Sequence, residues 1–190
     1  MSASRRDALA TGETRVGFVG LGNVGGKLAH SVMRNGYDLT VHDLDDRLVE
    51  AFVEQGAGAV DSPAALAEQC DVVVTCLPSP AASASVVEGA DGLHRAWSDG
   101  KVWLEMSTTD EAAITRLGAL GAAAGGEPAD CPVSGGCHRA ATGNISIFAG
   151  CERSTFDRIL PLLTVLGRRV LHTGPLGTAS VLKVATNYLA

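Results

Sequence analysis

The sequence of 190 residues contains no apolar run that approaches the length of a membrane-spanning helix. It also contains no cluster of lysine and arginine, and its net charge is −6, with the acidic residues spread along the chain. Proteins that bind nucleic acid or anionic membrane surfaces usually present a basic stripe, so we expect neither class of partner. The hydrophobic share of 46% is ordinary for a globular protein with a real core.

Metal-binding and export signals are also missing. None of the five cysteines belongs to a CxxC pair, and no group of cysteine and histidine has zinc spacing. We therefore expect reduced thiols and no metal site. The N-terminal segment MSASRRDALATGE lacks the apolar stretch of a secretory signal. Residues 1–14 are predicted to form a disordered tail, and the protein is expected in the cytoplasm.

From residue 15 onward, short apolar segments alternate with segments of helical periodicity. Strands are predicted over 15–20, 37–43, 59–60, 71–78, 101–107, 127–134, 144–150 and 168–174. Helices are predicted over 21–36, 45–56, from 62 onward, 80–88, 109–124, 152–166 and 178–190. This alternation predicts an α/β fold with a mostly parallel sheet covered by helices on both faces. Only a loop is expected between the strands at 127–134 and 144–150, so the last strands should run antiparallel at one edge.

The turn after the first predicted strand has the pattern GxGxxG, formed by Gly20, Leu21, Gly22, Asn23, Val24 and Gly25. It opens a predicted helix, and an acidic residue lies about 20 residues further on, which is the full context of a dinucleotide-binding turn. In such a turn Gly20 makes the tight bend and Gly22 lets the backbone approach a pyrophosphate. Gly25 lets helix and strand pack closely, and the helix N-terminus supplies N–H donors. The sequence therefore predicts a Rossmann-type, doubly wound dinucleotide-binding domain over 15–176.

Asp43, at the end of the second predicted strand, is the acidic residue of this pattern. Its carboxylate would accept hydrogen bonds from ribose hydroxyls and repel a 2′-phosphate, so NAD is expected as cofactor in preference to NADP. Three other interpretations stay open at this point. The glycines can form a plain strand-to-helix turn, Asp43 can be a solvated helix N-cap, and S-adenosylmethionine sites use a similar turn with an acid.

Several separated segments resemble one family, the β-hydroxyacid dehydrogenases. They are GFVGLGNVGGKLAHSVMRNGYDLTVHDLD near the N-terminus, VVVTCLPSP (72–80), EMSTTDE (105–111), DCPVSGGCHRAATGNISIFAG (130–150), and the closing helix with Lys183 and Asn187. The resemblance covers residues 15–190. It implies an NAD-dependent oxidoreductase that transfers a hydride between a nicotinamide and a short 3-hydroxy acid, resembling 3-hydroxyisobutyrate or glycerate, or its semialdehyde.

The resemblance also implies the roles of particular residues. Lys183 would be the catalytic acid–base group, which requires desolvation because the pKa of an ordinary lysine is about 10.4. The substrate would be bound by Ser134, Gly135, Gly136 and Asn187, and Leu77, Pro78 and Thr108 would line the cofactor. From the sequence alone, Lys183 is more simply interpreted as a lysine whose stem covers apolar helix surface, and only the resemblance favours the catalytic role.

In this family the closing helix continues into an all-helical second domain that closes the cleft and forms the dimer interface. The resemblance therefore implies that residues 177–190 are the start of an interdomain helix whose second domain is absent from this chain. We expect little or no activity from the chain alone, and a homo-oligomer for the complete protein. Two other interpretations stay open: a non-catalytic NAD-binding module, and a relative of the imine reductases, which usually replace the lysine with Asp or Tyr.

Overall fold

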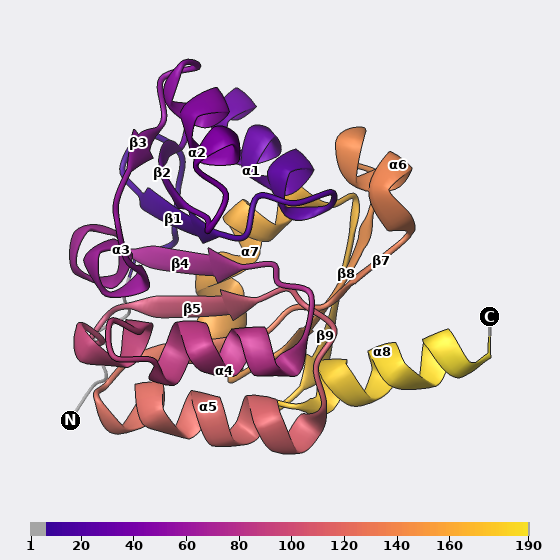
Figure 1. Cartoon of the computed structure of the whole chain (residues 1–190). Helices are drawn as coiled ribbons and strands as arrows, with labels where there is room; N and C mark the ends of the chain where they lie inside the picture. Colours follow the sequence, from indigo (N-terminus) through magenta and orange to yellow (C-terminus); the bar gives the residue numbers. More distant parts are fainter. Residues whose placement is uncertain (1–6, 190) are drawn as a thin grey trace.

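The computed structural model describes residues 7–189, and in this part of the chain nine strands form one sheet (Figure 1). The strands are β1 (Arg15–Val19), β2 (Asp38–His42), β3 (Gly58–Ala59), β4 (Val72–Thr75), β5 (Val102–Glu105), β6 (Glu127–Asp130), β7 (Val133–Ser134), β8 (Ser146–Gly150) and β9 (Arg169–Gly174). Their order is β3-β2-β1-β4-β5-β6-β8-β7, and β9 pairs with β8. The pairs from β3 to β6 are all parallel, which confirms the predicted α/β fold.

Helices cover both faces of the sheet (Figure 1). They are α1 (Gly25–Arg34), α2 (Asp46–Val53), α3 (Pro63–Gln69), α4 (Pro80–Glu88), α5 (Glu111–Ala123), α6 (Gly136–Ala141), α7 (Arg153–Leu166) and α8 (Thr178–Tyr188), with a 3₁₀ turn at Leu93–Arg95. One core cluster joins the strands to α1, α2 and α7, and a second joins them to α3, α4 and α5. Strands that are buried on both faces explain why the predicted strands read as continuous apolar runs.

The chain reverses its direction of winding between β1 and β4. From β1 it moves outward through β2 to β3, and it then crosses back to place β4 on the other side of β1. Ligands of doubly wound sheets bind in the crevice that such a reversal creates at the carboxyl ends of the strands. The fold therefore puts the Gly20–Gly25 turn and the segment after β4 at the expected place for a cofactor.

The last strands do run opposite to the main sheet, as predicted. β8 is antiparallel to β6 and to β7, and β9 is parallel to β8. Two details differ from the prediction: the strand expected over 127–134 is divided into β6 and β7, and the expected loop before β8 contains the short helix α6. Six residues are too few to show helical periodicity, and α6 is anchored by Ala140, which is fully buried in the core.

The segment before β1 lies against the fold in the described residues 7–14. Leu9 is buried, its N–H donates to the Arg158 carbonyl, and its own carbonyl accepts a hydrogen bond from the Tyr37 hydroxyl. Arg158 in turn donates to the carbonyl of Asp7. These residues therefore depart from the disordered tail expected over 1–14, and the rest of that prediction lies outside the described residues.

Candidate cofactor and substrate site

The glycine turn between β1 and α1 is shaped by close backbone packing. Gly20 has a φ of 93°, a left-handed value that disfavours a side chain. A Cβ atom at Gly25 would overlap the Gly20 carbonyl oxygen and would lie 3.2 Å from the Cys76 Cβ. A Cβ at Gly22, in contrast, would meet no atom within 4 Å. The open side of this turn therefore lies at Gly22, where the backbone can approach a pyrophosphate.

Asp43 follows β2 directly and faces the same turn. Its carboxylate accepts hydrogen bonds from the Leu21 N–H at 2.6 Å and from the Asp45 N–H at 2.9 Å. The N-cap of α2 is Asp45, whose side chain accepts from the Arg47 N–H. The Asp43 carboxylate is therefore bound to the backbone of the glycine turn, and Asp45, not Asp43, is the N-cap of α2. A carboxylate has about four lone-pair positions, so these two bonds leave acceptor capacity for ribose hydroxyls.

The segments after β4 and β5 lie at the same edge of the sheet as the glycine turn, because β1, β4 and β5 are parallel neighbours. The Leu77 N–H donates to the Ser107 hydroxyl at 2.7 Å, and the Ser107 N–H donates to Glu105 Oε1 at 2.8 Å. Leu77 is half-buried, whereas Pro78 and Thr108 are exposed. This chain of hydrogen bonds ties the Leu77-Pro78 segment to the end of β5, and so it fixes the spacing of the two predicted cofactor-lining segments.

Two buried carboxyl groups, at the ends of β5 and β6, were not singled out in the sequence analysis. Glu105 and Asp130 are opposite each other in the register of β5 and β6, and both have no exposed surface. Burial raises the pKa of both side chains. For Glu105 the signal in the sequence is a carboxylate at the end of the otherwise apolar strand β5. Strand β6 contains Glu127 as well as Asp130, so it carries no such signal.

The predicted substrate segment follows β7. Ser134 ends that strand, and Gly135 and Gly136 have φ values of 135° and 72°. Both glycines are exposed, and a Cβ at Gly136 would meet no atom within 4 Å. Their left-handed backbone turns the chain into α6 and leaves peptide N–H groups unshielded by side chains.

Lys183 lies on α8, and only 8% of its surface is exposed. Within the described residues its amine has no hydrogen-bond or ion-pair partner, and burial lowers its pKa below that of an ordinary lysine. Asn187, one turn further along α8, is exposed. The low exposure of Lys183 is the feature that its sequence position did not reveal.

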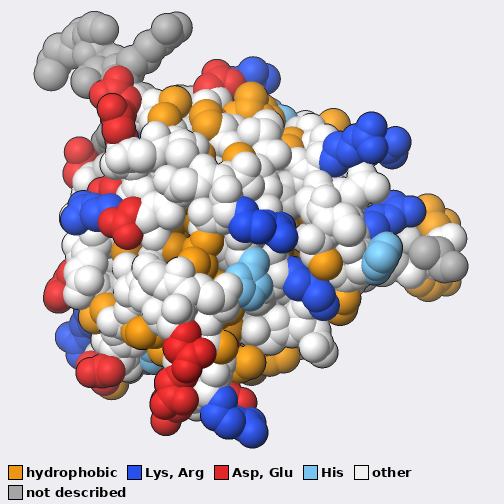
Figure 2. Space-filling view, turned by 90° about the horizontal axis from the view of Figure 1, so that it is seen from above, with side chains coloured by type: hydrophobic (Ala, Val, Ile, Leu, Met, Phe, Trp, Pro, Cys, Tyr) orange, Lys and Arg blue, Asp and Glu red, His pale blue; other side chains and the backbone are white. Residues whose placement is uncertain are grey.

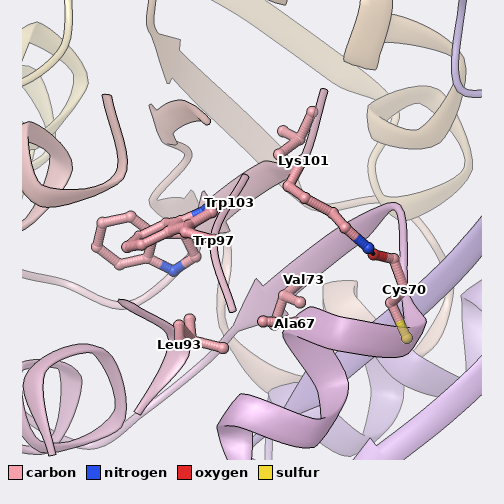
Figure 3. Close-up of a pocket in the computed structure, with 8 residues that line it drawn as sticks. Ala67, Cys70, Val73, Leu93, Trp97, Lys101 and Trp103 are labelled. Carbon is pink, nitrogen blue, oxygen red and sulfur yellow. Dashed lines mark hydrogen bonds between the residues drawn. The ribbon is translucent and has the colours of Figure 1, made fainter. Parts of the chain in front are cut away.

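Two hollows are lined by residues other than those predicted for the cofactor and substrate. A cavity of about 10 Å³ at the amino ends of β4 and β5 is lined by Trp97, Trp103 and Lys101, among others (Figure 3). Figure 3 shows the Lys101 amine pointing at Cys70, whose carbonyl it binds. This cavity holds about one water at most, and it lies at the end of the sheet opposite the predicted site.

A shallow surface groove of about 340 Å³ is lined by Lys27, His30, Arg34, Gln55 and Ala141. Figure 2 shows lysine, arginine and histidine side chains on the right-hand part of the face seen from above, without acidic side chains between them. His30 stacks on Phe52, with ring centroids 4.3 Å apart. The groove runs along α1, and the amine of Lys27 donates to the carbonyl of Asn23 in the glycine turn.

Comparison with known proteins agrees with this geometry. Residues 15–174 match the family model described as the NAD binding domain of 6-phosphogluconate dehydrogenase. The mitochondrial 3-hydroxyisobutyrate dehydrogenase of Mus musculus is 33% identical over 177 residues, which are 93% of this chain and 53% of the relative. The 2-(hydroxymethyl)glutarate dehydrogenase of Eubacterium barkeri is 31% identical over 175 residues, which are 92% of this chain and 58% of the relative.

A solved structure shares the fold as well. The crystal structure of 3-hydroxyisobutyrate dehydrogenase from Salmonella typhimurium superposes with a TM-score of 0.87 at 28% identity, covering 93% of this chain and 62% of that one. The chain thus spans about half the length of the curated relatives that it matches. Among the described residues, no helix is both long and apolar enough to cross a membrane. On the strength of its glycine turn, its sheet order and these similarities, the chain belongs to the β-hydroxyacid dehydrogenase family, of which it forms the N-terminal NAD-binding domain.

Proposed function

We propose that the protein carrying this chain is an NAD-dependent oxidoreductase that interconverts a short 3-hydroxy acid and its semialdehyde. The observation that carries the proposal is Lys183, a lysine with only 8% of its surface exposed and no partner for its amine among the described residues, on a helix that starts beside β6. The names of the mouse and bacterial relatives point to the same substrate class. The binding of NAD itself follows from the family.

Oxidation of a 3-hydroxy acid requires removal of a hydroxyl proton and of a hydride from the same carbon. A neutral Lys183 amine would accept the proton, and bound NAD would supply the acceptor for the hydride. Burial favours the neutral amine, because charge is costly away from water. In the reductive direction the ammonium form would return the proton to the oxygen.

The other predicted residues would hold the substrate for this transfer. Ser134 and the exposed N–H groups around Gly135 and Gly136 would bind the carboxylate, because left-handed glycine backbone can present several donors to one anion. Asn187 shares a face of α8 with Lys183 and would orient the hydroxyl-bearing carbon. Fixing the geometry in this way accounts for a large part of the rate in reactions between two bound groups.

The test is the variant Lys183→Ala in the protein that carries this chain, assayed with NAD and a panel that includes 3-hydroxyisobutyrate and glycerate. We expect kcat to fall by about 10²–10⁴-fold, as for loss of a general acid–base group, with NAD affinity unchanged. In the wild type, oxidation should increase as pH rises through the pKa of Lys183. That increase should occur below the ordinary lysine range, because burial lowers this pKa.

A matched control is Lys101→Ala, since burial also lowers the pKa of Lys101 but its amine lies at the opposite end of the sheet. It should leave kcat unchanged. If Lys183→Ala retains full turnover, another residue is the acid–base group. If NAD binds but no compound of the panel reacts, a non-catalytic NAD-binding module becomes the better interpretation. Reduction of cyclic imines in place of these acids would favour the imine reductase alternative.

We also propose that α8 begins an interdomain helix that packs on a further, helical domain, and that the complete protein is a homo-oligomer. In support, α8 exposes an apolar surface in this chain. The exposed residues are Val181 and Val184, each at 51%, Leu189 at 85% and Tyr188 at 90%. Without such a domain over the site we expect little or no turnover. We also propose a cytoplasmic location for this protein, in contrast to the mouse relative, which is named as mitochondrial.

A further inference from the structure

The N-terminus of α8 is capped by a residue from a distant strand. The Asp130 carboxylate accepts a hydrogen bond from the Gly177 N–H at 3.0 Å and another from the Ser180 N–H at 2.7 Å. These donors are 47 and 50 residues away in the sequence. Gly177, the N-cap position of α8, has no side chain that can cap the helix, and its φ is 96°. Asp130 therefore satisfies N–H groups that the helix itself leaves without partners.

A glycine on the neighbouring strand makes room for this contact. Gly150 is opposite Asp130 in the register of β6 and β8. A Cβ at Gly150 would overlap Asp130 Oδ1 and would lie 3.0 Å from the Ala179 nitrogen. Two strands and one helix therefore meet at a single carboxylate that has no exposed surface.

Asp130 is also connected by short stretches of chain to both parts of the proposed substrate site. It ends β6, and the chain continues through Cys131 and Pro132 into β7, which ends at Ser134. On the other side, Lys183 follows Ser180 by less than one helical turn. A shift of α8 relative to β6 would therefore move the amine relative to the substrate segment.

We propose that Asp130 is a positioning residue, which fixes the start of α8 to the end of β6 and thereby holds the Lys183 amine in place beside the Ser134–Gly136 segment. This inference rests on the proposed function, which makes the Lys183 amine the acid–base group whose position matters. The capping itself is independent of turnover. Asp130 acts through α8, and it does not itself contact the substrate.

The lysine content of the chain permits a direct test. The sequence contains three lysines, Lys27, Lys101 and Lys183, so lysine labelled with ¹³C at Cε gives a simple NMR titration. Asp130→Ala should move the pKa of Lys183 upward, toward that of an ordinary lysine, because α8 loosens and the amine becomes hydrated. The pKa of Lys101, which burial also lowers, should stay unchanged. Amide hydrogen exchange in the first turns of α8 should become about ten-fold faster, the size expected for loss of a helix N-cap.

Three further variants separate positioning from general loss of stability. Asp130→Asn retains one acceptor oxygen and should give a smaller effect, confined to α8. Gly150→Ala displaces the carboxylate without removing it and should give the same pattern as Asp130→Ala. Ser62→Ala removes the N-cap of α3, which accepts from the Ala65 N–H at 3.2 Å, and should leave α8 and Lys183 unchanged.

The proposal is overturned if the Asp130→Ala variant folds but has the same amide hydrogen-exchange rates in α8 and the same Lys183 pKa as the wild type. It is also overturned if Asp130→Asn shifts Lys101 and Lys183 together, since that result shows a general structural role. If the Ala variant does not fold, the Asn and Gly150→Ala variants decide in the same way. Where turnover is measurable, Asp130→Asn should lower kcat with NAD affinity unchanged. A selective effect on α8 without any lysine-dependent turnover would refute the proposed function and leave the capping intact.

Discussion

Two glycines of the same turn should respond to alanine in opposite ways. At Gly25 a Cβ would overlap the Gly20 carbonyl oxygen and would lie 3.1 Å from that carbonyl carbon and 3.2 Å from the Cys76 Cβ. These are backbone and strand-end atoms, which cannot move without displacing β4 or α1. We expect Gly25→Ala to lower the free energy of unfolding by about 3 kcal/mol, at the upper end of the usual cost of overpacking.

Gly22→Ala should leave stability almost unchanged and still weaken cofactor binding. A Cβ there meets no atom within 4 Å, and Gly22 is not among the residues with positive φ. Restricting the unfolded chain can even stabilise the variant by about 0.4–1 kcal/mol. The added methyl group would, however, occupy the space through which the pyrophosphate approaches the backbone. We expect at least a ten-fold loss of NAD affinity, which corresponds to about 1.4 kcal/mol.

Urea denaturation would measure the stability of both variants, and isothermal titration calorimetry would measure NAD binding. Gly56→Ala is the control, because Gly56 also has open space around it but has a φ of 99°. That variant should lose about 1 kcal/mol of stability through backbone strain alone and bind NAD normally. If Gly22→Ala binds NAD as tightly as the wild type, the pyrophosphate does not lie on this turn. If Gly25→Ala unfolds at the wild-type urea concentration, the packing argument is wrong.

Two further predictions concern Asp43 and Arg158. Asp43→Asn keeps an acceptor for the Leu21 N–H but removes the charge, so NADP affinity should rise toward that of NAD in calorimetry; unchanged selectivity would show that the charge does not discriminate. Arg158→Ala removes donors to Glu127 and to the Gly100 carbonyl at a site where the two side chains are only 11% and 16% exposed. The free energy of unfolding measured in urea should fall by about 3 kcal/mol, and Arg158→Lys should restore part of it. A change below about 0.5 kcal/mol would contradict a stabilising role for this ion pair.

Local rules were sufficient for the main elements of this fold. Gly20 and Gly25 mark a strand-to-helix turn because steric overlap of the backbone leaves no alternative there, and the spacing to Asp43 follows from the length of one helix and one strand. The continuous apolar strands indicate burial on both faces. These features repeat within a few residues, so a single sequence is enough to recognise them. Helix α6 was missed because six residues carry no usable period.

Contacts between distant segments required the structure. The hydrogen bonds that join Leu9 to Tyr37 and Arg158 depend on where β2 and α7 lie, and no pattern within residues 7–14 predicts them. The hydrogen bonds from Leu77 to Ser107 and from Ser107 to Glu105 depend on the order and register of β4 and β5. No periodicity in the sequence specifies either of them.

The sequence by itself determined that a glycine turn, an acidic residue and a lysine helix follow one another in the order of an NAD-binding domain. Only the tertiary structure decided that Lys183 is largely buried, with no partner for its amine among the described residues, and that Asp130 caps the helix that carries it. The physical reason is that desolvation and capping depend on which atoms surround a group in space. Those atoms come from strands and helices that are dozens of residues apart along the chain.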